Sequence, residues 1–302
     1  NYAIQHPDAS QILALAQALA AITGATLGVC TESANTVGGY VAGALPQSGG
    51  QHAQAMLGVD GGESCRAFVL LHAEPEFDCA NPVAARAALE KADFVAVLSE
   101  FRTALRYADV LLPIAPFTET SGTFINCEGR VQHFHGVVRP AGDSRPGWKV
   151  LRVLGTMLGV PGFDFDTAEA VRDAVLDAAG DWQQRLGNAT RLEVAAPAKP
   201  SGGVERVADV PIHFADPLVR RAASLQATAD AKPPKARLHR ALLDQLGLAE
   251  GAQIKVRQGR GEAVLATQVD PQVPPGVVRI AAAHPSTCGL EGLSGPITVE
   301  RA

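Results

Sequence analysis

Short, continuous apolar runs alternate with amphipathic segments through the first half of the chain. The clearest apolar runs are residues 67–71, 94–98 and 110–112, and helical periods lie between them. Runs of this length, bounded by turn residues, are typical of strands that a parallel sheet buries on both faces. Their alternation with helices favours an α/β fold with right-handed crossovers.

Amphipathic periodicity predicts the helices around these strands. Residues 9–23 carry an apolar stripe that ends at Gly24. Residues 82–91 follow Asn81, a good capping residue, and begin with a proline, which suits the first turn of a helix. We also predict a strand at 26–30 and helices at 101–107 and 148–158. A further helix is predicted to begin at a capping box formed by Asp166 and Glu169 and to end at about residue 179.

The pattern changes in the last third of the chain. Residues 195–203 are rich in proline, alanine and glycine, which is typical of a linker. One short helix is predicted at 238–246, and short strands follow it at 253–257, 262–269, 277–283 and 297–299. We therefore predict a parallel Rossmann-like α/β domain with flanking helices over residues 1–190, a linker over 191–210 and a small β-barrel domain over 211–302.

Composition narrows the classes of function. The chain has 302 residues, of which 47% are hydrophobic and 19% charged, as expected of a folded protein, and a net charge of -5 argues against a nucleic-acid binder. Its five cysteines form no closely spaced pair, so we expect scattered, mostly buried thiols rather than an iron–sulfur, zinc or disulfide framework. No apolar run reaches the ~18–20 residues that span a bilayer, so we expect no direct membrane insertion.

The polar stretch over residues 117–154 is the richest candidate for chemistry. Long loops in compact domains are usually functional or interfacial, although a loop held by salt bridges is an equally good interpretation. Six charged residues could form those ion pairs: Glu119, Glu128, Arg130, Arg139, Asp143 and Arg145. A second basic group, Arg220, Arg221, Lys235, Arg237 and Arg240, is interpreted as a solvated hinge beside the barrel rather than an anion site.

Two histidines in this stretch have the spacing of a metal pair. His133 and His135 would share one face of a strand, but no third ligand follows at short spacing, because Cys127 and Glu128 lie across a predicted turn. We therefore expect no metal site. The chain also contains neither the glycine fingerprint for dinucleotides, nor a Walker phosphate loop, nor a nucleophile elbow, and we identify no catalytic residue.

An ordered set of motifs nevertheless resembles a known superfamily. The segments ADVLLP at 108–113, GTF at 122–124 and EGRVQ at 128–132, with Glu119 and Asn126, resemble the signature of the molybdopterin oxidoreductases. The segment RPGWKVLR at 145–152 is similar to the large iron–sulfur subunit of bacterial NADH–quinone oxidoreductase (complex I), as are residues 34–39 and 74–78. The resemblance covers residues 30–175 well and 235–290 more weakly, as the barrel domain of the molybdopterin-dinucleotide-binding kind.

The resemblance implies specific sites. Asn126, Arg130 and Gln132 match a loop that lies near the pterin in the molybdenum enzymes, and we interpret them as a vestigial cofactor-side loop. Many of those enzymes carry an arginine where this chain has Gly129, and that difference favours a chain without the cofactor. The iron–sulfur clusters and the residue that holds the metal belong to earlier parts of the family's fold, so we expect this chain to be a C-terminal piece that holds no cofactor.

Two functional interpretations follow from the resemblance. In the first, the chain is a non-catalytic scaffold of the large iron–sulfur subunit of complex I, supporting electron transfer from NADH to quinone. It would contact other subunits of the peripheral arm, bind no nucleic acid and lie on the cytoplasmic side of the inner membrane. In the alternative, it is part of a true molybdopterin-dependent, formate-dehydrogenase-like oxidoreductase. Its crevice at 74–78 and its loop at 126–132 would then hold the pterin cofactor.

Overall fold

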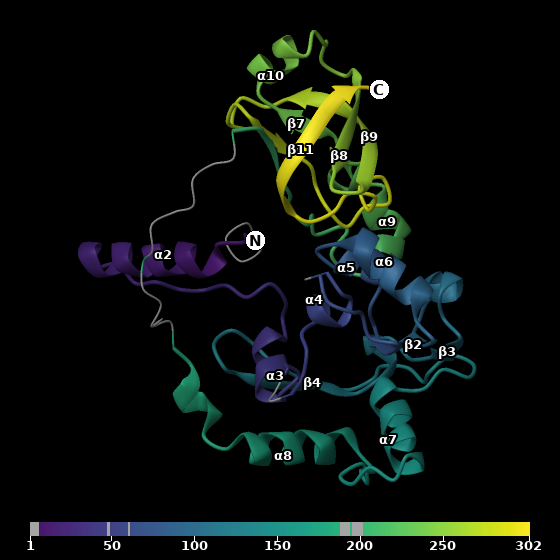
Figure 1. Ribbon diagram of the computed structural model, residues 1–302. Coiled ribbons are helices and arrows are strands. Elements are labelled where there is room, and N and C mark those ends of the chain that lie inside the picture. The colour runs from purple at the N-terminus through teal and green to yellow at the C-terminus, as the bar shows by residue number, and fades with distance from the viewer. Residues whose placement is uncertain (1–5, 47–48, 60, 188–193, 195–201) are drawn as a thin grey trace. The chain divides into compact units, whose positions relative to one another are not determined.

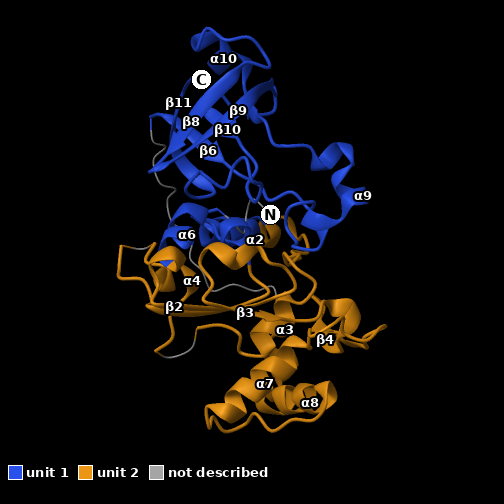
Figure 2. Ribbon diagram, turned by 90° about the vertical axis from the view of Figure 1, so that its right-hand side faces the viewer, with its two compact units in different colours: residues 1–19, 74–88, 191–302 blue, residues 20–73, 89–190 orange. Residues whose placement is uncertain are grey.

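The computed structural model describes residues 6–46, 49–59, 61–187, 194 and 202–302. The chain divides into two compact units, coloured separately in Figure 2. The barrel unit comprises Asn1–Leu19, Glu74–Ala88 and Arg191–Ala302, and the sheet unit comprises Ala20–Ala73 and Leu89–Thr190. Helices α2 (Ala9–Thr23) and α6 (Pro82–Lys91) each have residues in both units.

A parallel sheet organises the sheet unit, as predicted. Its three strands, β1 (Ala67–Leu71), β2 (Phe94–Ser99) and β3 (Val110–Pro113), lie side by side in that order (Figure 1). Their buried side chains form a core with those of neighbouring helical residues: Phe68, Leu89, Val95, Val97 and Ala104. The α/β prediction is confirmed, together with the bounds of β1 and α6 and the capping role of Asn81, whose Oδ1 accepts the Ala84 N–H at 3.0 Å.

The expectation that both faces of the sheet are covered holds for only part of the sheet among the described residues. Val69 on β1 is 58% exposed and Phe94 on β2 is 44% exposed, whereas Phe68 and Val95 are buried. Since side chains alternate between the faces of a strand, the face with Phe68 and Val95 packs into the core. The opposite face is open at Val69 and Phe94 but covered at Leu98, which is 1% exposed.

The remaining elements of the sheet unit are short. They are α3 (Thr36–Val41), α4 (Ala53–Met56), η1 (Thr103–Arg106), η2 (Phe117–Glu119), β4 (Gly122–Ile125), β5 (Val131–Phe134), α7 (Gly147–Met157), α8 (Ala168–Ala179) and η3 (Trp182–Arg185). The predicted strand at 26–30 does not form, because no strand pairs with it in the described structure, and the predicted helix at 101–107 is a single 3₁₀ turn. Thr167 rather than Asp166 caps α8, through its hydroxyl and the Ala170 N–H.

The barrel unit confirms the predicted small barrel. Six strands close in the order β10-β6-β11-β8-β9-β7 (Figure 1). Their bounds are β6 (Val204–Val207), β7 (Ala236–Leu238), β8 (Gln253–Gln258), β9 (Gly261–Val269), β10 (Val277–Arg279) and β11 (Ser294–Arg301). The other elements are α5 (Pro75–Asp78), η4 (Val219–Arg221), α9 (Ala223–Gln226), η5 (Ala229–Ala231) and α10 (Arg240–Gln245). β6 lies within the range predicted as linker, and residues 188–193 and 195–201 of that range lie outside the described residues.

Alternation along the strands fills the barrel. Ile254 and Val256 on β8 and Leu265 on β9 point inward and are buried, while the residues between them face outward. One inward side chain is charged: the guanidinium of Arg206 donates to Gln258 Oε1 at 3.0 Å and to the Gly292 carbonyl at 2.7 Å. None of the described helices is long and apolar enough to cross a membrane.

Candidate functional site

The β4–β5 hairpin carries the three residues predicted to lie beside a cofactor. Asn126 shapes its turn, because its Oδ1 accepts the backbone N–H groups of Glu128 at 3.1 Å and Arg130 at 2.9 Å. The side chains of Arg130 and Gln132 are not buried. None of the three lines a cavity described here. The cofactor-side role of Asn126, Arg130 and Gln132 therefore stays a prediction.

Gly129 has a local reason to be glycine. Its φ is +80°, in the left-handed region, and a Cβ at this position would lie 2.2 Å from Leu186 Cδ1. The absence of an arginine at this position thus follows from the geometry of the turn. It is no longer an argument against a cofactor.

Two charged side chains of the polar stretch, those of Glu119 and Arg145, bind the loop backbone. Within the described residues, none of the six predicted ion-pairing residues forms a salt bridge. Glu119 Oε2 instead accepts the Ala141 N–H at 3.0 Å, and Arg145 donates to the Ser144 carbonyl at 2.7 Å. Loop carbonyls and N–H groups lack ladder partners, so these side chains take their place. The prediction of an ion-paired loop is wrong.

A cavity of about 650 Å³ lies beside this loop in the sheet unit. Three cationic side chains line it, those of Arg139, Arg145 and Lys149. Three carboxylates face them, and these are Glu119, Asp166 and Glu169. The charges balance, so the lining has no preference for an anion or a cation.

Two of the basic residues in the predicted hinge form ion pairs, and the side chain of one of them, Arg220, is largely buried. In the barrel unit Glu74, only 2% exposed, accepts from Arg220 Nη1 at 2.8 Å and from Arg221 Nη1 at 3.1 Å. Arg220 also pairs with Asp78 and lies over the ring of Phe77. A buried carboxylate needs such partners. The prediction of a solvated hinge is wrong for Arg220 and Arg221. The carboxylates of Glu74 and Asp78 already bind these arginines.

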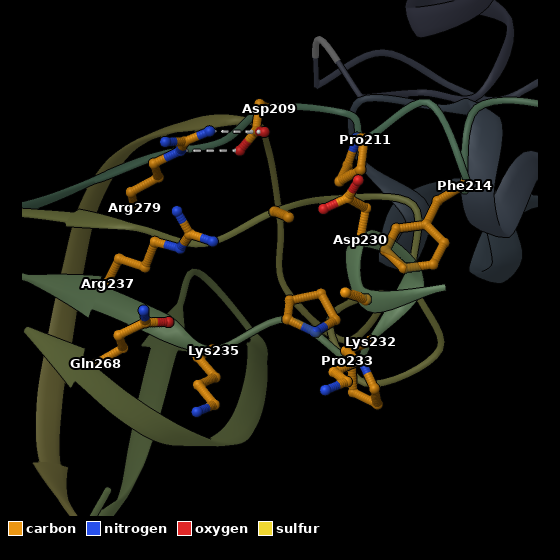
Figure 3. Close-up of a pocket in the computed structure, with 13 residues that line it drawn as sticks. Asp209, Pro211, Phe214, Asp230, Lys232, Pro233, Lys235, Arg237, Gln268 and Arg279 are labelled. Carbon is orange, nitrogen blue, oxygen red and sulfur yellow. Dashed lines mark hydrogen bonds and ion pairs between the residues drawn. The ribbon is translucent and has the colours of Figure 1, made fainter. Parts of the chain in front are cut away.

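Lys235 and Arg237 of that group line a second cavity, of about 280 Å³, in the barrel unit (Figure 3). Three side chains from adjacent strands form one wall, because Arg237 on β7 stands opposite both Gln268 on β9 and Arg279 on β10. Their strand neighbours are buried in the barrel, so these three project from its outer surface. Pro211 and Phe214 lie across the cavity from this wall.

The barrel cavity carries an excess of positive charge. Its lining holds four cations, Lys232, Lys235, Arg237 and Arg279, against the carboxylates Asp209 and Asp230. Asp209 forms a bidentate ion pair with Arg279, with distances of 3.2 Å from Oδ1 to Nε and 3.0 Å from Oδ2 to Nη2. In the part of the chain that is described, Lys232, Lys235 and Arg237 form no ion pair. Unpaired cations facing a cavity favour an anionic ligand.

The basic residues of this cavity are visible in the sequence, but the cavity itself is not. Lys235 and Arg237 are conspicuous in the chain, yet the acidic and apolar walls come from residues 209–214 and 229–234, which no local signal places beside them. Similarly, Glu169 lies next to the two histidines predicted to share a strand face. Its carboxylate is 3.1 Å from His133 Nε2, although the two residues are 36 positions apart in sequence.

Comparison with known proteins finds relatives that are named as putative formate dehydrogenases. A protein named "Putative formate dehydrogenase" from Staphylococcus aureus (strain USA300) is 45% identical over 75 residues, which are 24% of this chain and 8% of the relative. Its namesake from Staphylococcus haemolyticus (strain JCSC1435) is 35% identical over 115 residues, which are 38% of this chain and 12% of the relative. The chain therefore matches only a small part of the length of these relatives.

A solved structure shares the fold. Acetylene hydratase from Pelobacter acetylenicus superposes with a TM-score of 0.58 at 16% sequence identity. The match covers 82% of this chain and 46% of the hydratase. At this identity the likeness concerns the fold alone.

Two family matches overturn the expectation that this chain holds no cofactor. Residues 219–296 match the molydopterin dinucleotide binding domain, a range that includes Lys232, Lys235, Arg237 and Arg279 of the barrel cavity. Residues 1–157, more than half of the chain, match the molybdopterin oxidoreductase family. Together the two matches point to a molybdopterin cofactor. The chain belongs to the molybdopterin oxidoreductase family.

Proposed function

We propose that this chain is part of a molybdopterin-dependent oxidoreductase of the formate-dehydrogenase kind, and that the barrel cavity binds an anionic part of its cofactor. The observation that carries the proposal is a cluster of cations, Lys232, Lys235 and Arg237, that have no ion-pair partner among the described residues. They line a cavity within the range matched to dinucleotide binding. Formate as the substrate rests on the names of the relatives. These matches favour this function over the complex I scaffold.

The residues of the cavity fit a phosphate-bearing group. Arg237 offers a planar fork of N–H donors that can bind two phosphate oxygens, and Lys235 offers a compact charge beside it. At about 280 Å³ the cavity falls just below the ~300–1,000 Å³ of pockets that enclose whole drug-sized ligands. It therefore suits one end of a dinucleotide rather than the whole molecule.

Each part of the cavity has a distinct task in this proposal. When bound, a molybdopterin group supplies the redox chemistry of such an enzyme. Arg237 and Lys235 neutralise its negative charge, while Asp209 fixes Arg279 and so keeps the strand wall in place. Pro211 and Phe214 exclude water from the opposite side, which strengthens the charged contacts. In the hairpin of the sheet unit, Asn126, Arg130 and Gln132 are proposed to lie on the pterin side.

Activity and metal content of the full-length protein test this function. We would purify the protein that contains this chain without oxygen, measure molybdenum, tungsten and iron by elemental analysis, and follow formate-dependent reduction of a dye acceptor. The expected result is molybdenum or tungsten in stoichiometric amount together with formate-dependent turnover. A folded protein that contains iron but neither molybdenum nor tungsten, and that does not oxidise formate, would overturn the proposal in favour of the scaffold.

A further inference from the structure

A cluster of side chains of the types that ligate metals lies in the sheet unit, whereas the barrel cavity belongs to the other unit. The cluster consists of His133 on β5, His135 directly after that strand, and Glu169 in the first turn of α8. One ligand atom from each residue lies within 4.8 Å of the other two. The two-residue spacing places both imidazoles on the same face of the hairpin, and the rings meet edge to face at a centroid distance of 4.6 Å.

The distances suit a small ion. Glu169 Oε1 lies 3.1 Å from His133 Nε2 and 4.0 Å from His135 Nδ1. Around a tetrahedral ion with bonds of about 2.0–2.1 Å, neighbouring ligand atoms lie about 3.4 Å apart. These two separations lie on either side of this value, so the three ligand atoms are already near the spacing that such an ion requires.

A second hydrogen bond orients the less exposed histidine. Thr123, directly opposite His133 in the β4–β5 ladder, holds its hydroxyl 3.1 Å from His133 Nδ1. A ligating imidazole commonly binds an outer partner through its other nitrogen, which fixes the ring and presents the free lone pair to the metal. With Nδ1–H donating to Thr123, His133 Nε2 offers that lone pair toward Glu169.

The donor set selects a class of ion. We propose that the cluster of His133, His135 and Glu169 binds one divalent late first-row transition metal ion such as Zn²⁺. Two neutral imidazoles and one carboxylate are ligands that such ions take, whereas Mg²⁺ and Ca²⁺ require oxygen ligands. Three protein ligands leave a further coordination position for water or another small ligand. The proposal uses no residue of the barrel cavity.

Cobalt is the probe that tests this site. The 302-residue chain would be treated with a chelator and then titrated with Co²⁺, whose visible absorption reports nitrogen and oxygen ligands at low coordination number, and with Zn²⁺ by calorimetry. The expected result is saturation at one ion per chain, displacement of Co²⁺ by Zn²⁺, and no competition from Mg²⁺ or Ca²⁺.

Variants show whether the cluster is responsible. Glu169→Gln and His135→Ala should each weaken Zn²⁺ binding at least tenfold. His135 is 72% exposed at its side chain, so its removal does not threaten the fold. His6→Ala is the matched control, because it removes an exposed histidine that lies near a carboxylate, Asp8, and should leave binding unchanged. Non-saturable binding, or equal affinity in all three variants, would overturn the proposal and leave the cluster as an imidazole–carboxylate hydrogen bond.

Discussion

Arg237 on β7 stands directly opposite Arg279 on β10, and of the two only Arg279 has a carboxylate partner, Asp209, within the described residues. Like charges opposite each other in a sheet are destabilising, by up to roughly 1 kcal/mol. An anion bound at Arg237 would remove this repulsion. The strand wall is thus better suited to a ligand than to an empty cavity.

Replacing Arg237 by alanine should weaken cofactor retention without weakening the fold. In the full-length protein, Arg237→Ala is expected to lower the amount of pterin that survives purification several-fold, whereas the midpoint of thermal unfolding of the 302-residue chain should stay equal or rise slightly. Arg240→Ala is the matched control, since Arg240 pairs with Asp244 on the surface of α10. Equal pterin content in both variants would contradict the assignment of the cavity.

Gly129 should resist substitution because of its surroundings as well as its backbone. Gly129→Ala combines a left-handed φ, which costs about 1–2 kcal/mol, with a clash against Leu186. Gly142→Ala meets the same kind of backbone cost in open space, at a φ of +55°. Urea unfolding should therefore show a larger loss of stability for Gly129→Ala. Equal losses would mean that Leu186 moves aside freely.

The buried guanidinium of Arg206 should stabilise the barrel despite the free-energy cost of burying its charge. Burial lowers the pKa of Arg206 to about 10, which corresponds to a cost of about 3 kcal/mol for the charge. Its removal would strip hydrogen-bond donors from Gln258, the Gly292 carbonyl and the Ile280 carbonyl, at about 1–3 kcal/mol for each acceptor.

The loss of these hydrogen bonds outweighs the relief of no longer burying the charge, so Arg206→Met should lower the free energy of unfolding by about 2 kcal/mol. Arg301→Met, on the exposed end of β11, serves as the control and should change little. An Arg206→Met variant as stable as the original chain, or more stable, would show that burying the charge costs at least as much as its hydrogen bonds contribute.

The described cysteines differ in exposure, against the expectation of mostly buried thiols: Cys30 and Cys127 are exposed and the others are half-buried. Burial, together with the nearby carboxylates of Asp78 and Glu76, raises the pKa of Cys79 to about 11. About one Cys79 thiol in a thousand is then ionised at pH 8. Mass spectrometry after iodoacetamide treatment at pH 8 should find Cys127 modified long before Cys79. The rate at Cys79 should rise about tenfold for each unit of pH up to about 10. Comparable rates at pH 8 would contradict the shift.

Elements with local signals could be predicted from the sequence, and elements that depend on distant partners could not. The strand β1 and the helix α6 have the predicted bounds, because an apolar run and a cap with a following proline define them locally. In contrast, β6 was missed. Its pairing partners are residues 277–279 and 294–297, which are far along the chain. The apolar run at 26–30 has no such partner in the described structure and is not a strand.

The same distinction applies to the candidate sites. The sequence shows that His133 and His135 share a face, but only the fold brings Glu169 to them. Likewise, the family motif suggests that this chain has lost an arginine at position 129. The positive φ of Gly129 and the nearby Leu186 instead explain why a glycine is found there. In both cases the decisive information is a distance between residues that no local pattern encodes.

The pterin content of the full-length protein tests the central claim most directly. Protein purified without oxygen would be denatured and oxidised, and the fluorescence of the released pterin would be measured per chain, with the iron content as a check that the protein is intact. We expect the chain to release pterin in stoichiometric amount, at least about one per chain. Intact, iron-containing protein that releases no pterin would contradict it.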